Sequence, residues 1–160
     1  MSLVTLVSGG IDATLMVVLA NEEGICQLPL FIDYGQICRE QELNACIYVH
    51  EKLGLPHPAV MNLSGFGNLI SSGLTDRNMK INEDAFLPSR NLLFLVAGSA
   101  YAYQQNCNAV AMLLVGLTAT WRPDTVYANC ADLNSLSIGH YQTTGKNWHW
   151  SRVLFFYLRR

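Results

Sequence analysis

The chain is poor in charged residues. Asp, Glu, Lys and Arg make up 14% of its 160 residues, and the formal net charge is −2. Because nucleic-acid-binding surfaces need an excess of Lys and Arg, this balance argues against direct contact with nucleic acid. Hydrophobic residues, by contrast, make up 51% of the chain. This high apolar content predicts that another copy covers part of the surface, so we expect a homo-oligomer.

The sequence also lacks long apolar runs and metal-binding cysteine spacing. No stretch approaches the roughly 20 apolar residues that span a bilayer, and the N-terminus has no basic start typical of a signal peptide. We therefore expect no membrane partner and a cytoplasmic location. No two cysteines form a Cys-x-x-Cys pair; the five are Cys26, Cys38, Cys46, Cys107 and Cys130. Their wide spacing is typical of reduced thiols and predicts no zinc ligands.

Strand and helix patterns alternate through the first part of the chain. Short apolar runs are typical of buried strands, and they fall at residues 3–7, 27–33, 59–63 and 108–116. Apolar residues recur at helical spacing over residues 36–53, which Gly54 ends, and over residues 88–103, which Pro88 opens. A shorter helical pattern covers residues 13–20. This alternation predicts an α/β fold with a Rossmann-like, doubly wound parallel sheet.

Two parts of the chain do not follow this alternation. Residues 64–85 are rich in Gly, Ser, Asn and Asp, and this segment is too long for a simple connection. We expect a loop that serves as a lid or substrate-binding insertion. Residues 135–150 show no clear period, and residues 153–158 fit either a strand or a helix.

The first predicted strand runs into the segment Ser8-Gly9-Gly10-Ile11-Asp12. Two glycines allow a tight turn with exposed N–H groups, and the following helix directs the positive end of its dipole at this turn. The hydroxyls of Ser8 and Thr14 can add donors. Because Asp12 would repel a bare phosphate, it indicates Mg²⁺ between carboxylate and phosphate. The segment predicts a pyrophosphate-binding turn, and an ordinary strand-to-helix turn is the alternative.

Three motifs in this sequence resemble those of one enzyme family. Residues 8–14 resemble the signature of ATP pyrophosphatases in the adenine-nucleotide α-hydrolase-like superfamily. Within that superfamily, Phe31-Ile32-Asp33-Tyr34-Gly35-Gln36 is similar to the second-strand motif of the 7-cyano-7-deazaguanine synthases. The segment Phe86-Leu87-Pro88-Ser89-Arg90-Asn91 is similar to the Pro-Gly-Arg-Asn helix start of the same family. The motifs occur in the family's order, which makes the resemblance more specific than any single match.

The resemblance implies an adenine-nucleotide α-hydrolase-like fold and a two-stage reaction in queuosine and other 7-deazapurine biosynthesis. ATP adenylates the carboxylate of 7-carboxy-7-deazaguanine, and ammonia displaces AMP to give an amide. A second activation dehydrates the amide to the nitrile. By this resemblance, residues 1–132 form an ATP-pyrophosphatase-like nucleotide-binding domain. Residues 133–160 form a divergent C-terminal segment.

The resemblance also implies roles for individual residues. The nucleotide would be held by residues at two strand ends: Ser8, Gly9, Gly10, Ile11, Thr14, Asp33, Tyr34 and Gly35. Asp12 and Arg90 are the catalytic candidates: Asp12 would hold Mg²⁺ through phosphate, and Arg90 would contact phosphate or the substrate carboxylate. Asn129 stands where the family has a substrate-binding acid, and it can hydrogen-bond a purine-like edge but cannot supply a charge. Asp33 could instead cap the helix that follows it.

Departures from the family pattern keep further alternatives open. Ala13 replaces the second serine of the signature, and Ser89 replaces the glycine before the family arginine. Arg90 could form a surface pair with Glu83 or Asp84. The family's four C-terminal zinc-binding cysteines have no counterpart, so we expect no zinc. A degenerate nucleotide-binding relative without catalysis is therefore the main alternative to an active enzyme, and a related amidotransferase or sulfur-transfer protein is a third.

Overall fold

A computed structural model describes residues 2–115, 137–140 and 151–157 of the chain. In the first half, the elements are β1 (Ser2–Val7), α1 (Ile11–Glu22), β2 (Cys26–Asp33), α2 (Arg39–Leu53), β3 (Ala59–Asn62) and α3 (Gly65–Leu69). They are followed by α4 (Ile81–Asp84), α5 (Arg90–Gln104), β4 (Ala109–Val115), β5 (Ser137–His140) and β6 (Ser151–Tyr157). The alternation of strands and longer helices up to β4 is the predicted one.

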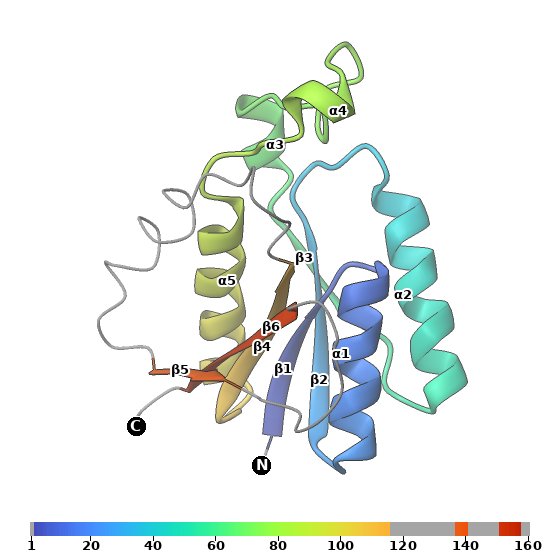
Figure 1. Ribbon diagram of the computed structural model, residues 1–160, viewed down its shortest axis with the longest axis vertical. Coiled ribbons are helices and arrows are strands. Elements are labelled where there is room, and N and C mark those ends of the chain that lie inside the picture. Colours follow the sequence, from blue (N-terminus) through green and yellow to red (C-terminus); the bar gives the residue numbers. More distant parts are fainter. Residues whose placement is uncertain (1, 116–136, 141–150, 158–160) are drawn as a thin grey trace.

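The strands form one sheet with the order β3-β2-β1-β4-β6-β5 (Figure 1). The first four strands in this order are parallel, and Leu3 of β1 lies opposite Gln27 of β2 and Ala109 of β4. The chain therefore starts at the centre of the parallel part and is wound outward in both directions. This arrangement confirms the predicted α/β, Rossmann-like architecture.

Two further strands correct the expectation of a wholly parallel sheet. β6 pairs antiparallel with β4, and β5 pairs antiparallel with β6. The sequence did not decide between strand and helix for residues 153–158, and the structure forms a strand there. β5 lies where the sequence shows no clear period. Both strands lie beyond β4 in the sheet order. Strand formation there depends on pairing with a neighbouring strand more than on the local residue pattern.

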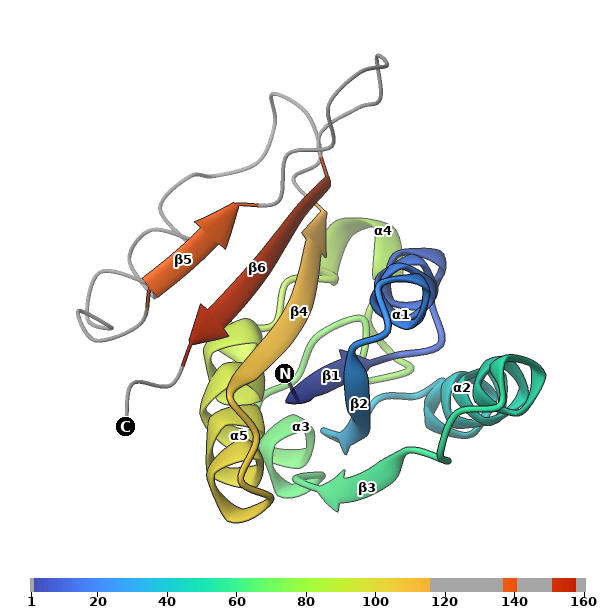
Figure 2. The same ribbon diagram turned by 90° about the horizontal axis from the view of Figure 1, so that it is seen from below.

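Helices cover both faces of the parallel strands (Figure 2). α1 and α2 lie on one face, and α5 and α3 lie on the other. α5 packs closely on β1 and β4, because a Cβ added at Gly98 would lie 3.0 Å from Val110 Cγ1 and 3.1 Å from a Leu6 methyl. β1 itself is buried from Leu3 to Val7, as a central parallel strand covered on both faces should be. None of the described helices combines the length and hydrophobicity needed to cross a bilayer.

The segment at residues 64–85 is more ordered than the predicted loop. It contains the short helices α3 and α4, which lie beyond the carboxyl ends of the strands (Figure 1). The Gly67 N–H donates to the Tyr34 carbonyl at 2.9 Å, and the Gly73 N–H donates to the Asp84 carbonyl at 2.8 Å. Composition suggested a loop because it is rich in Gly and Ser, but here the glycines allow close backbone packing. The segment still lies where a substrate-binding insertion would lie, and that role stays a prediction.

Candidate functional site

Ser8-Gly9-Gly10 connects the end of β1 to the start of α1. We call this segment the phosphate turn, after the pyrophosphate binding that the sequence predicts for it. Gly9 has φ +73°, and an added Cβ would collide with the Glu42 carbonyl oxygen and lie 3.0 Å from the Ala45 Cβ. Gly9 is therefore required both by backbone conformation and by the close approach of α2. Gly10 is different, because it has φ −75° and a Cβ there would meet only the Ser8 hydroxyl, at 3.6 Å. The space beside Gly10 is open.

The N-terminus of α1 is exposed and has no side-chain cap. Gly10 is the N-cap residue, and its carbonyl accepts the first helical hydrogen bond from the Thr14 N–H at 3.0 Å. The unpaired N–H groups of a first helical turn, together with the helix dipole, form a site that favours anions. Ile11 has an 88% exposed side chain, so it can contribute only its backbone here. Asp12 is exposed in the same turn and is free to take part in metal binding.

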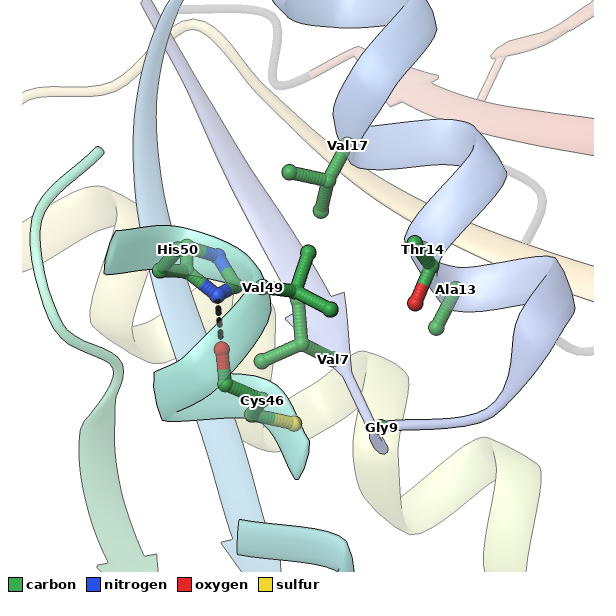
Figure 3. Close-up of a pocket in the computed structure, with 8 residues that line it drawn as sticks. All are labelled: Val7, Gly9, Ala13, Thr14, Val17, Cys46, Val49 and His50. Atoms are coloured by element: carbon green, nitrogen blue, oxygen red, sulfur yellow. Dashed lines mark hydrogen bonds between the residues drawn. The ribbon is translucent and has the colours of Figure 1, made fainter. Parts of the chain in front are cut away.

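A hollow of about 170 Å³, part of it open to solvent, lies between α1 and α2 (Figure 3). It is lined by Val7, Gly9, Ala13, Thr14, Val17, Cys46, Val49 and His50. The lining is mostly apolar, so the hollow does not suit a phosphate group. Thr14 borders this hollow, and its action as a phosphate donor stays a prediction. His50 is buried, and its Nδ1 lies 2.6 Å from the Cys46 carbonyl oxygen, so its ring is part of the packing between α1 and α2.

The turn after β2 is held by its own side chains. The Gly35 N–H donates to Asp33 Oδ1 at 3.1 Å, and the Tyr34 N–H donates to Gln36 Oε1 at 2.9 Å. These bonds delay the start of α2 to Arg39, three residues after the predicted start at Gln36. Gly35 is needed here, since it has φ +87° and an added Cβ would lie 2.9 Å from the Ser64 carbonyl.

Asp33 is buried and paired. Its Oδ2 lies 2.6 Å from Arg39 Nε, so the carboxylate is joined to the first residue of α2. The N-cap residue of α2 is Cys38, and no side chain caps that helix. Asp33 is therefore joined to α2 by an ion pair with Arg39, and it does not cap that helix, which was the alternative considered from sequence. Its contact with adenosine stays a prediction.

Tyr34 packs its ring against α5. The ring centroid lies 5.2 Å from that of Phe94, and only 6% of the residue is exposed. Burial raises the pKa of the Tyr34 hydroxyl, while the nearby Arg90 lowers it. At neutral pH the hydroxyl is therefore protonated and polar rather than charged. The predicted role of Tyr34 in lining the adenosine pocket is not settled by this packing and stays a prediction.

Arg90 begins α5 and is held by aromatic rings. Its guanidinium carbon lies 5.8 Å from the Tyr34 ring centroid and 5.9 Å from the Phe94 ring centroid. Such stacking orients a guanidinium and leaves other N–H groups for an anion. The guanidinium thus faces Tyr34 and Phe94, which differs from the surface pair with Asp84 considered from sequence. The Glu83 side chain lies outside the described residues.

Glu42 is a site residue that sequence reasoning missed. It is half-buried on α2, and Gln36 Nε2 donates to its Oε2 at 3.1 Å. Burial raises the pKa of Glu42, although the Gln36 hydrogen bond and the charge of Arg90 lower it. One signal could have identified it: Glu42 stands four residues before the buried Cys46 and eight before the buried His50, on the inward stripe of the helix. An acid on that stripe indicates a polar neighbour.

The remaining expectations concern metal ligands and Asn129, which stands where the family has a substrate-binding acid. Within residues 2–115 and the two later strands, no three His, Cys, Asp or Glu side chains gather as a metal site. Asn129 and Cys130 lie outside the described residues. The absence of zinc therefore stays a prediction, as does the substrate contact of Asn129. Asp12 alone suits Mg²⁺ if phosphate oxygens supply further ligands, because Mg²⁺ is usually bound by one or two carboxylates plus phosphate.

Comparison with known proteins identifies the family of this chain. A family model described as "Queuosine biosynthesis protein QueC" matches residues 2–143. The chain belongs to the QueC family. The match includes the phosphate turn, the turn after β2, Arg90 and Asn129. This match confirms the resemblance to the 7-cyano-7-deazaguanine synthase family that three motifs indicated. It also confirms the adenine-nucleotide α-hydrolase-like fold.

Individual relatives are named 7-cyano-7-deazaguanine synthase. The chain is 26% identical over 133 residues to the 7-cyano-7-deazaguanine synthase of Campylobacter hominis, which covers 78% of this chain and 60% of that protein. It is 28% identical over 129 residues to the synthase of Campylobacter concisus, covering 76% of this chain and 58% of that protein. The synthase of Nautilia profundicola is 26% identical over 129 residues, with the same two coverages. The chain thus spans about three fifths of the length of these relatives.

Proposed function

We propose that this QueC-family chain catalyses the ATP-dependent conversion of 7-carboxy-7-deazaguanine to 7-cyano-7-deazaguanine. The observation that carries the proposal is the open, uncapped start of α1 at the carboxyl edge of the sheet, where Gly9 is required for packing and Gly10 leaves space. Doubly wound sheets bind their ligands at this edge. The names of the relatives supply the substrate class. We also propose a cytoplasmic homodimer or larger homo-oligomer.

The nucleotide half of the site is formed by β1, α1 and the turn after β2. In the proposal, the backbone N–H groups of Gly9, Gly10 and Ile11 bind the pyrophosphate of ATP, and the hydroxyls of Ser8 and Thr14 add donors. Adenosine lies against the neighbouring strand end, formed by Asp33, Tyr34 and Gly35. Asp12 holds Mg²⁺, which neutralises negative charge on the pyrophosphate when bound.

The substrate half of the site is centred on Arg90. The stacked guanidinium is oriented to bind the substrate carboxylate or the α-phosphate, and it stabilises negative charge as pyrophosphate leaves. Ammonia then displaces AMP from the activated carboxylate, giving the amide and a proton. The amide oxygen attacks the α-phosphorus of a second ATP and releases pyrophosphate, and loss of AMP from carbon and of two protons from nitrogen gives the nitrile. Asn129 hydrogen-bonds the deazaguanine edge in this scheme.

A second candidate function is nucleotide binding without nitrile formation. Asn129 favours it, because an amide cannot replace the charge of the acid that the family resemblance leads us to expect there. Catalysis needs the α-phosphorus and the carboxylate in line, and small misplacements cost orders of magnitude in rate. Binding of ATP needs only its own half of the site. In this second case the chain alone would bind ATP and form the nitrile weakly or not at all.

Calorimetric titration separates these functions. ATP·Mg²⁺ and 7-carboxy-7-deazaguanine are titrated singly and then together, and an assay with ammonium measures AMP and nitrile. ATP binding without nitrile supports the second candidate. Turnover comparable to that of one of the curated synthases supports the first and shows that Asn129 suffices. If neither ligand binds, both functions are wrong.

A further inference from the structure

The first turns of α2 lie against the phosphate turn. A Cβ added at Gly9 would collide with the backbone carbonyl oxygen of Glu42 and lie 3.0 Å from the Ala45 Cβ, so the helix and the turn are in direct contact. One turn after Glu42, Cys46 lines the hollow between α1 and α2 together with Gly9 (Figure 3). The position of α2 therefore limits where the phosphate turn can lie.

Two side-chain links join the start of α2 to the turn after β2. The helix needs them, because its N-cap residue, Cys38, makes no capping hydrogen bond. One link is the ion pair between Arg39 and Asp33, whose arginine side chain is 40% exposed. The other is the hydrogen bond from Gln36 Nε2 to Glu42 Oε2 at 3.1 Å, in which Gln36 is buried and Glu42 half-buried. Because water competes less for a buried hydrogen bond, the second link constrains the helix more strongly.

Gln36 is itself fixed at the end of β2 by two further hydrogen bonds. Its Oε1 accepts from the Tyr34 N–H at 2.9 Å, and its Nε2 also donates to the Ile32 carbonyl at 3.2 Å. A primary amide has two N–H donors, so Nε2 can serve Ile32 and Glu42 together. The side chain of Gln36 thus joins the backbone at the end of β2 to the helix that contacts Gly9.

We propose that Gln36 and Glu42 are positioning residues that set the distance between the phosphate turn and the end of β2. The inference rests on the proposed nucleotide-binding function, in which pyrophosphate binds at the first of these places and adenosine at the second. Neither side chain needs to touch the ligand. Because ATP must engage both places at once, a small shift of α2 relative to β2 weakens ATP binding more than it weakens binding of either half.

The first test compares two neutral substitutions at Glu42. Glu42→Gln keeps an oxygen that can accept the hydrogen bond from Gln36, whereas Glu42→Ala removes the acceptor. Both substitutions remove the same charge, so the comparison between them reports the link alone. Gln41→Ala is the matched control, because Gln41 is an exposed side chain next to Glu42 on the same helix.

Calorimetric titration measures how each protein binds ATP·Mg²⁺, AMP and pyrophosphate with Mg²⁺. We expect E42A to bind ATP·Mg²⁺ roughly tenfold more weakly than E42Q, since one net hydrogen bond is worth about that factor. For AMP or pyrophosphate, each of which binds one side of the site, we expect less than about a threefold difference. A general loss of stability would not separate ATP from its two halves. Q41A should match the parent, and thermal unfolding checks that all four proteins are folded.

A second pair of variants tests Gln36. Gln36→Glu removes both N–H donors and brings a second carboxylate to Glu42, while the additional change Glu42→Gln supplies a donor from the other side. The Ile32 carbonyl loses its donor in both proteins, so their comparison isolates the link. At about pH 8, well above the ordinary range of carboxyl pKa values, we expect Q36E to bind ATP·Mg²⁺ at least about tenfold more weakly than Q36E/E42Q. If Q36E does not fold, the Glu42 pair decides alone.

The possible results separate the inference from the proposed function. Equal ATP affinities of E42A and E42Q, in a parent that binds ATP, would show that the link does not position the site, and the proposed function would stand. Equal losses for ATP and for pyrophosphate would mean that the link shapes the phosphate turn itself, which also overturns the inference. A double variant that binds ATP no better than Q36E would overturn it as well. If the parent binds neither ATP nor pyrophosphate, the proposed function fails, and the inference fails with it.

Discussion

Substitutions at the two glycines of the phosphate turn should have different effects: at Gly9 on the stability of the fold, and at Gly10 on nucleotide binding. Gly9→Ala should destabilise the fold, because alanine at φ +73° has a left-handed backbone that costs about 1–2 kcal/mol. The added methyl also meets the Glu42 carbonyl and lies 3.0 Å from the Ala45 Cβ, so α2 must move. Crowding of this kind costs about 1–3 kcal/mol, and we expect a total loss of about 2–5 kcal/mol.

Gly10→Val should leave the fold intact and weaken nucleotide binding. The backbone at Gly10 has φ −75° and ψ 163°, which valine adopts readily, and the space around its Cβ is open. Stability should fall by about 1 kcal/mol, since glycine is preferred over an apolar residue at an N-cap. The branched side chain would occupy the space through which a phosphate approaches the N–H groups. We expect ATP·Mg²⁺ affinity to fall at least about tenfold.

Thermal unfolding and calorimetric titration of both variants measure these effects. At about 2–4 °C per kcal/mol for a domain of this size, G9A should unfold roughly 4–20 °C below the parent. G10V should unfold close to the parent. A G9A protein as stable as the parent would show that Gly9 does not have the described conformation. A G10V protein that binds ATP normally would remove the turn from the proposed site.

Four further predictions concern other parts of the chain. Asp12→Asn should reduce ATP affinity in Mg²⁺ and abolish its Mg²⁺ dependence, and unchanged titrations would exclude Asp12 as the metal ligand. Ser89→Gly should raise the free energy of unfolding by about 0.5–1 kcal/mol, because Ser89 has φ 58° and makes no capping hydrogen bond; a lower melting temperature would contradict this. Elemental analysis should find no stoichiometric zinc, and one zinc per chain would reveal a site outside the described residues. Light scattering should show a dimer or larger assembly, since α1 leaves Ile11, Leu15 and Leu19 exposed on one face, whereas a stable monomer would refute it.

The parallel core could be predicted from sequence because buried parallel strands are continuous apolar runs. β1 and β2 are of this kind, and Gly54 marks the end of α2 with φ +66°, as a glycine after a helix often does. β6 could not be assigned, since the six-residue apolar run at residues 153–158 fits a strand or a buried helix equally well. Its pairing with the edge of β4 decides the matter, and that pairing is a tertiary contact.

The turn after β2 shows a second limit of sequence reasoning. Helical periodicity placed the start of α2 at Gln36, but the side chains of Asp33 and Gln36 bond the local backbone and hold it out of the helix. The burial of Glu42 was also missed, because a charged residue in a helical pattern is ordinarily assigned to the solvent-exposed face. The position of Arg90 was predicted by motif, yet its orientation by Tyr34 and Phe94 depends on the start of α5 lying beside the turn after β2.

The two glycines of the phosphate turn look equivalent in the sequence and differ in the structure. Gly9 is fixed by the approach of α2, because a side chain there would meet the backbone carbonyl of Glu42. Gly10 has no protein contact that a side chain would disturb, and its φ of −75° is open to other residues. The described packing therefore does not require glycine at this position, and in the proposed site the close approach of a phosphate is a reason for it. On that proposal, the two adjacent glycines combine one requirement of folding with one of binding.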